Sequence, residues 1–154
     1  MTRITQALLV LIIAIAAATS LRAASDDLLG SWLNQKQDAK IDIFKCGNEF
    51  CGKIVWLKEP VYPAGAKEGT PGSPKIDYKN PDAARQKAPL MGLQIMDGFQ
   101  FTGDNFWKNG KIYDPDSGKT YSSKITMTSH DQLDLRGFIG VSMFGRTEKW
   151  TRAK

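Results

Sequence analysis

Histidine and cysteine, which are common in catalytic and metal sites, are scarce in this sequence of 154 residues, which has one histidine and two cysteines. The histidine, His130, stands between Ser129 and Asp131 in a turn-like stretch. Adjacent side chains diverge in a turn, so these three residues cannot form a catalytic triad. No glycine-rich phosphate-binding motif is present in the sequence. We therefore expect a protein that is not an enzyme and that needs no cofactor.

The two cysteines, Cys46 and Cys51, are too few for a metal centre. Their C-x4-C spacing differs from the C-x-x-C spacing of redox catalysts. With His130 as the one further soft ligand, the chain cannot assemble a structural zinc site by itself. We expect no metal. In an oxidising compartment Cys46 and Cys51 would form a disulfide.

Long apolar runs are absent except near the N-terminus, where residues 7–18 are all Ala, Leu, Val or Ile. Arg3 precedes this run and small residues follow it, which is the order of a secretory signal peptide. The run is shorter than the roughly 20 residues of a membrane-spanning helix. We expect residues 1–24 to be a signal peptide, cut between Ser20 and Ala24, and residues 25–154 to form one periplasmic or secreted domain without a membrane span. An uncleaved membrane anchor is the alternative.

Neither sign of charge dominates. Loss of residues 1–24 would remove Arg3 and Arg22 and no acid, so 19 of the 21 Lys and Arg would face 16 Asp and Glu. The resulting net charge of about +3 is too small, and the cations too scattered, to indicate nucleic-acid binding. We expect a solvated surface of mixed charge and no nucleic-acid partner.

Helical periodicity is missing after residue 24, whereas the alternation typical of β-strands recurs at short intervals. Residues 40–46 and 51–57 predict a hairpin in which Cys46 and Cys51 face each other, and Asn109-Gly110 predicts another hairpin turn. Further strands are expected over residues 29–34, 92–96, 99–107 (with a turn or bulge at 103–105), 111–114, 120–128, 132–139 and 141–151. About eight strands joined by tight turns indicate an all-β fold, either a sandwich or an up-and-down antiparallel barrel.

Residues 58–89 hold six of the seven prolines and cannot form a central strand or a long helix. Irregular segments of this length are often functional. Asp77 and Asn80 are expected to order this proline-rich loop through hydrogen bonds from side chain to backbone. A lid over the barrel is the alternative.

The two ends of the expected fold favour the barrel. Gly30-Ser31-Trp32 opens the first strand, and Arg152 closes the last. This arrangement resembles the lipocalin or calycin pattern, in which a G-x-W tryptophan plugs one end of the barrel and a cation of the final strand covers its ring. The resemblance implies that Trp32 and Arg152 close the barrel.

A wider resemblance joins this chain to a bacterial family known as domain of unknown function 2147. It is carried by Cys46-Gly47, Cys51–Leu57, Asp77–Pro81, Pro89–Gly92, Gly110–Pro115 with Gly118 and Tyr121, Leu133–Gly140, and the stretch from Arg146 to Arg152. These segments extend over essentially the whole chain after residue 24. The resemblance implies a secreted bacterial protein with a calycin-like fold, and it implies no activity.

Two arginines are the main candidates for binding. In the last strand, Phe144, Arg146 and Glu148 share one face because side chains alternate. An inward-facing Arg146 needs a partner, since an isolated buried charge is costly. That partner is either an acid of the protein or the anionic head of a ligand. Arg136 lies on one face with Asp134 and Phe138 in the preceding strand.

From these features we expect a barrel that binds a small apolar or amphipathic anionic molecule inside it or at its mouth. Arg136 and Arg146 would face the anionic part, Trp56 and Phe138 would form the apolar wall, and Tyr78 would contribute from the proline-rich loop. The alternative is an envelope interaction or structural protein with an envelope protein as its partner. Its barrel would be filled by side chains, because eight strands leave an interior just wide enough for them.

Overall fold

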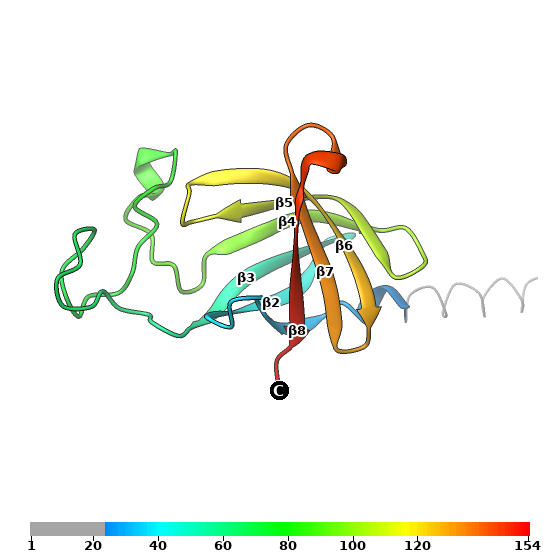
Figure 1. The fold of residues 1–154 in the computed structure, drawn as a ribbon, viewed down its shortest axis with the longest axis horizontal. Helices are drawn as coiled ribbons and strands as arrows, with labels where there is room; N and C mark the ends of the chain where they lie inside the picture. The colour runs from blue at the N-terminus through cyan, green and yellow to red at the C-terminus, as the bar shows by residue number, and fades with distance from the viewer. Residues whose placement is uncertain (1–23) are drawn as a thin grey trace, which may run out of the picture.

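A computed structural model describes residues 24–154 and shows a closed antiparallel barrel in which each strand pairs with the next and the last pairs with the first (Figure 1). The strands are β1 (Gly30–Leu33), β2 (Ala39–Cys46), β3 (Glu49–Leu57), β4 (Gln94–Phe101), β5 (Phe106–Asp114), β6 (Lys119–Ser129), β7 (Gln132–Phe138) and β8 (Arg146–Arg152). The prediction of an all-β, up-and-down barrel of about eight strands is confirmed. The expected signal peptide, apart from Ala24, lies outside the described residues.

The hairpin of β2 and β3 carries the disulfide between Cys46 and Cys51, as expected. Its turn is shorter than the sequence suggested, because β3 already begins at Glu49, opposite Cys46. Cys51 pairs with Phe44 instead. The expectation that the two cysteines face each other directly is therefore wrong. They are diagonal neighbours on one face, with Cα atoms 5.9 Å apart, which suits a disulfide.

Asn109-Gly110 is a bulge inside β5, so the predicted hairpin turn at this position is wrong. The β5–β6 register shifts between Trp107 and Gly110, and Asn109 has a φ of 63°. The ring of Phe99 packs where a side chain at position 110 would lie, which requires glycine there. The β4–β5 turn lies at residues 102–105 instead, where Gly103, Asp104 and Asn105 all have positive φ. The separate strands expected over 92–96 and 99–107 are thus one strand, followed by a turn and the start of β5.

The segment 58–93 between β3 and β4 is irregular, as its prolines require. It contains one short 3-10 helix, η1 (Ala83–Arg85), and two isolated backbone bridges, Val61 with Pro74 and Ile76 with Pro89. A second 3-10 helix, η2 (Ser142–Phe144), interrupts the strand expected over 141–151, so β8 begins only at Arg146. Within residues 24–154, no helix is long and apolar enough to cross a membrane.

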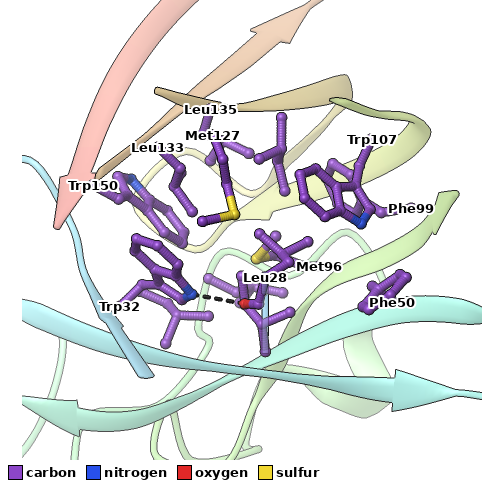
Figure 2. Close-up of a cluster of buried hydrophobic side chains, with 14 of the residues drawn as sticks. Leu28, Trp32, Phe50, Met96, Phe99, Trp107, Met127, Leu133, Leu135 and Trp150 are labelled. Carbon is purple, nitrogen blue, oxygen red and sulfur yellow. Dashed lines mark hydrogen bonds between the residues drawn. The ribbon is translucent and has the colours of Figure 1, made fainter. Parts of the chain in front are cut away.

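One end of the barrel is plugged by residues of the N-terminal segment. Leu28 and Trp32 are fully buried, and the indole nitrogen of Trp32 donates a hydrogen bond to the Leu28 carbonyl over 2.9 Å (Figure 2). The Arg152 guanidinium lies 4.3 Å from the centre of the Trp32 ring. It also donates to the carbonyls of Asp27, Leu29 and His130. The first and last strands therefore meet at a seam that is covered by a cation, as the two terminal motifs implied.

Above this plug the barrel is filled by side chains. The buried cluster includes Phe50, Met96, Phe99, Trp107 and Met127, which come from the central strands (Figure 2). Phe50 meets Trp107 edge to face, with ring centres 6.3 Å apart. The filling reaches only part of the way along the barrel, and this determines where a site can form.

Candidate functional site

A cavity of about 760 Å³ occupies the other end of the barrel, opposite the Trp32 plug. In an up-and-down barrel the turns alternate between the two ends. The β1–β2, β3–β4, β5–β6 and β7–β8 connections therefore gather at one end, and residues from all four line this cavity. We call this end the mouth and the plugged end the base. The barrel is thus neither hollow throughout nor filled throughout.

The floor of the cavity is apolar. Each strand turns alternate side chains inward, so the next inward position above the filled half lines the cavity. The floor residues are Ile41 of β2, Ile54 of β3, Ile95 of β4, Leu135 of β7 and Trp150 of β8, and all are buried. An apolar group that entered the mouth would meet aliphatic side chains and one indole ring.

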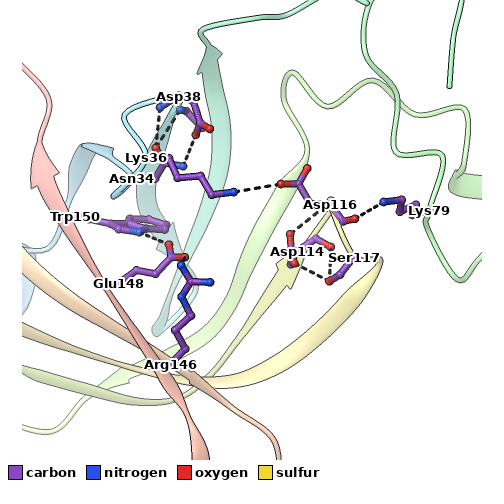
Figure 3. A network of polar contacts seen from close by, with 11 residues as sticks. Asn34, Lys36, Asp38, Lys79, Asp114, Asp116, Ser117, Arg146, Glu148 and Trp150 are labelled. Atoms are coloured by element: carbon purple, nitrogen blue, oxygen red, sulfur yellow. Dashed lines mark hydrogen bonds and ion pairs between the residues drawn. The ribbon is translucent and has the colours of Figure 1, made fainter. Parts of the chain in front are cut away.

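Strand β8 supplies a ladder of inward side chains from the base to the mouth. Arg152 covers Trp32 at the base, and Trp150 follows on the floor. The indole nitrogen of Trp150 donates to Glu148 Oε2 over 3.3 Å (Figure 3). One step higher, Arg146 Nη2 lies 3.9 Å from Glu148 Oε1, and the Arg146 side chain is 75% exposed. The expected facing of Arg146 is therefore correct, and its partner is an acid of the protein at the rim.

Charges of both signs surround the mouth. Lys36 and Asp116 form an ion pair of 3.7 Å between the β1–β2 and β5–β6 turns, and Lys79 donates to the Asp116 carbonyl over 2.6 Å (Figure 3). Four cations and five carboxylates line the cavity in all: Lys36, Lys58, Lys75 and Arg146, and Asp38, Glu59, Asp114, Asp116 and Glu148. The net charge of the mouth therefore does not select for anions, and any such preference depends on Arg146 locally.

The proline-rich loop is fastened to the barrel through a buried carboxylate. Asp77 is 1% exposed and accepts hydrogen bonds from the Tyr113 hydroxyl at 2.7 Å and from the Asn80 amide at 2.6 Å. The Asn80 side chain in turn accepts a hydrogen bond from the Asp82 backbone amide, and the Asn80 backbone carbonyl accepts one from the Gln86 side-chain amide. Burial, and then the hydrogen bond and charge of Asp77 and the charge of Asp114, raise the pKa of Tyr113 above its ordinary value. The Asn80 side chain thus bonds the backbone as expected, whereas the bonds of the Asp77 carboxylate are to the side chains of Asn80 and Tyr113 and not to the backbone. Tyr113 joins the loop to the cavity wall.

A second contact holds the same loop. Gly118 ends the β5–β6 turn with a φ of 70°, and the carbonyl oxygen of Lys79 lies where a Cβ would stand. Only glycine fits both the backbone conformation and this close approach. The loop is therefore a fixed wall of the mouth in this structure.

Three of the five residues expected to bind a ligand do not line the cavity. Arg136 points away from it and donates to the carbonyls of Ser142 and Met143 and to the Thr147 hydroxyl. Trp56 lies on the outer surface under Lys40. Tyr78 is exposed, with the Lys79 ammonium 5.3 Å from its ring centre. Arg146 and Phe138 do line the cavity.

The orientation of Trp56 has a specific cause. Lys40 pairs with Trp56 but Ile41 pairs with Ile54, so Val55 is an extra residue in β3. Such a bulge reverses the alternation beyond it, which turns Trp56 outward and Leu57 inward. Sequence alternation alone placed Trp56 on the face of Ile54, and it carries no signal for the bulge.

Sequence reasoning also missed residues that line the cavity. Trp150, Tyr113 and Tyr121 are not among the site residues that the sequence predicts. All three line the cavity. The available signal was the alternation of β8, which predicts that Glu148 and Trp150 accompany Arg146.

The cavity combines an apolar floor with a charged rim. The only histidine lies at the β6–β7 turn at the base, and both cysteines are in the disulfide, so neither residue type lines the cavity. Glu148, the carboxylate above the floor, is engaged by Trp150 and Arg146. An apolar floor below a charged rim matches a molecule with one apolar and one polar end.

Comparisons with known proteins agree with this description. The model of a family described as "Uncharacterized protein conserved in bacteria (DUF2147)" matches residues 30–152. A solved structure described as protein HP1028 from the human pathogen Helicobacter pylori, belonging to the lipocalin family, superposes with a TM-score of 0.68 at 20% sequence identity. The match covers 82% of this chain and 83% of that one, which shows a shared fold. No curated protein shows a significant sequence match.

Proposed function

We propose that this chain, which belongs to the DUF2147 family of uncharacterised bacterial proteins, binds a small amphipathic molecule in the open end of its barrel. The observation that carries the proposal is the cavity of about 760 Å³. Its volume lies within the range of about 300–1,000 Å³ found for small-molecule sites, and its apolar floor lies below a rim of charged side chains. The proposed role is binding and not catalysis.

The lining suggests how such a molecule would lie. Its apolar part would cover the Ile41, Leu135 and Trp150 side chains of the floor. Its polar part would stay at the rim, where Arg146 offers an exposed guanidinium. Arg146 is held by Glu148 at a distance of 3.9 Å, which leaves several of its N–H groups available to an anionic head group.

The N-terminal sequence pattern and the disulfide support a periplasmic or secreted location for this activity. A disulfide persists in an oxidising compartment, whereas the cytosol keeps most thiols reduced. Expression of the full chain, followed by mass determination of the exported product, tests both the location and the cleavage between Ser20 and Ala24. An intact chain retained in the cytoplasm would contradict this part of the proposal.

Binding can be tested with 1-anilinonaphthalene-8-sulfonate, an amphipathic anion whose fluorescence rises in apolar sites. Ile112 lies on the cavity wall and is half-buried, so Ile112→Trp should fill the entrance and weaken binding at least about tenfold. Thr126→Trp adds a comparable ring to the exposed outer face of β6 and should leave binding unchanged. Arg146→Gln should weaken binding of the anionic probe more than that of a neutral probe.

The result that would overturn the proposal is non-saturable probe binding, or equal binding by the wild type and Ile112→Trp. The absence of any copurified molecule in native mass spectrometry of protein isolated from its source organism would also count against the proposal. If the wild type and Ile112→Trp both captured a protein in stoichiometric amount from periplasmic extract, this result would instead support the alternative of an envelope interaction protein.

A further inference from the structure

The β7–β8 loop, residues 139–145, presents the most exposed group of large apolar side chains in the described part of the chain. Val141 is 60% exposed, Ile139 69%, and Met143 and Phe144 are each 79% exposed. The other large apolar side chains that reach the surface within residues 24–154 are Trp56, Val61, Tyr78 and Met91, at 38–42%. The loop, which includes η2, projects from the barrel at the top of the view in Figure 1. Water contact with this much apolar surface is unfavourable and indicates a binding surface.

The composition and the internal hydrogen bonds of the loop favour transfer of its tip from water into an apolar phase. Its sequence, Ile-Gly-Val-Ser-Met-Phe-Gly, contains no charged residue. Arg136 donates from Nε to the Ser142 carbonyl over 2.8 Å and from Nη2 to the Met143 carbonyl over 3.1 Å. The Phe144 amide donates to the Val141 carbonyl over 3.2 Å. Backbone groups that are satisfied internally do not oppose transfer into an apolar phase.

Cations without acidic partners stand behind the apolar tip. Lys124 and Arg136 are directly opposite each other on β6 and β7, an arrangement of like charges that disfavours the sheet. Within the described residues, neither forms an ion pair with a carboxylate. Lys124 reaches the loop at Ser142 Oγ over 3.4 Å. Arg146, the first residue after the loop, is a further exposed cation, although it lies 3.9 Å from Glu148. The loop is therefore an apolar tip with a cationic base.

We infer that the β7–β8 loop docks this protein onto the surface of an anionic lipid bilayer. Val141, Met143 and Phe144 would enter the boundary between head groups and acyl chains, and Lys124 and Arg136 would lie among the anionic head groups. Ile139 and Phe144 also line the cavity, so docking would bring the mouth next to the membrane. Docking needs no occupant in the cavity and therefore does not depend on the proposed function.

Sedimentation with vesicles tests the inference. The wild type should bind vesicles of phosphatidylcholine and phosphatidylglycerol in equal parts, and bind pure phosphatidylcholine vesicles more weakly. The double variant Val141→Ser/Met143→Ser should bind at least about tenfold more weakly. Lys124→Gln should bind about fivefold more weakly at low salt, and this difference should shrink at high salt. The matched control Val61→Ser/Met91→Ser removes the same residue types from the proline-rich loop and should bind like the wild type.

The result separates docking from ligand binding, because Val141 and Met143 do not line the cavity. Their double variant should keep the fluorescence titration with 1-anilinonaphthalene-8-sulfonate and the unfolding midpoint of the wild type. Equal vesicle binding by this variant and the wild type, or no binding to anionic vesicles at low salt, would overturn the inference. An oligomer in analytical ultracentrifugation that this variant dissociates, without vesicle binding by the wild type, would also overturn it and would assign the loop to self-association.

Discussion

At the scale of single residues, the interactions with most effect are those in which one side chain joins distant parts of the chain. Arg152 is the main example, because its guanidinium contacts the Trp32 ring and three carbonyls from two other segments. The β1–β8 pairing that it covers is short and consists of Trp32 with Arg152 and Leu33 with Thr151. The contacts of the Arg152 side chain therefore supplement a short backbone pairing where the barrel closes.

Arg152→Ala should lower the free energy of unfolding by about 3 kcal/mol, because it removes a cation–π contact and leaves carbonyl groups without their donor. Arg152→Lys should recover only part of this loss, since an ammonium cannot reproduce the planar fork of donors. Urea unfolding of both variants measures the effect. A loss below about 0.5 kcal/mol for Arg152→Ala, the scale of an ordinary surface substitution, would show that the seam does not need this cap.

Tyr113 makes stability depend on pH in the alkaline range. Its raised pKa means that the folded protein keeps the phenol proton above pH about 10, where an unfolded tyrosine loses it. The unfolded state then binds fewer protons, so the free energy of unfolding falls as the pH rises past that value. Tyr113→Phe should lose about 2 kcal/mol at neutral pH, through the lost hydrogen bond to Asp77, and should show a weaker fall above pH about 10. Urea midpoints measured from neutral to alkaline pH compare the two proteins, and parallel curves would contradict the assignment.

At the scale of elements, the proline-rich loop is attached to the barrel at two points. It is held by Asp77 on Tyr113 and by Lys79 against the β5–β6 turn. Its irregular course follows from its prolines, whereas the points where it touches the barrel come from contacts between residues far apart in the sequence.

Two glycines with the same backbone conformation test this attachment. Gly118→Ala should free the loop, because φ is 70° and the Lys79 carbonyl occupies the position of the new methyl group. Gly72→Ala has a φ of 80° but open space around it, so it carries only the backbone cost of about 1 kcal/mol. Limited proteolysis should cut the loop faster in Gly118→Ala than in Gly72→Ala. Equal cutting rates would show that the contact with Lys79 does not hold the loop.

The elements also show which structural features can be predicted from the sequence. Alternation, turn residues and the two terminal motifs were enough for the number of strands, the closure of the barrel and the facing of Arg146. They failed where a bulge reversed the alternation, at Val55 before Trp56 and at Asn109 in β5. Whether Arg136 holds a loop or faces a ligand is decided by the path of residues 139–145, which contain a 3-10 turn that the expected strand did not include.

At the scale of the whole molecule, the barrel is packed at its base and open at its mouth. The same substitution should therefore lower the free energy of unfolding by different amounts at the two ends. Ile125→Ala in the filled half should cost about 2–5 kcal/mol, because it creates a void among tightly packed side chains. Ile112→Ala on the cavity wall should cost about 1 kcal/mol, since the space beside it is already open. Urea unfolding at neutral pH compares the two. Equal costs would mean that the cavity wall is packed as tightly as the core in solution.

The even number of strands determines at which end of the barrel the chain enters and leaves it. With eight antiparallel strands, the start of the first and the finish of the last fall on the same side, and the hydrogen bond from the Ala153 amide to the Ser31 carbonyl marks that side as the base. A tag or surface linker joined after Lys154 would therefore extend away from the rim. Immobilising the protein through its C-terminus should leave the opening and the β7–β8 loop accessible, whereas coupling through rim lysines such as Lys36 should obstruct them.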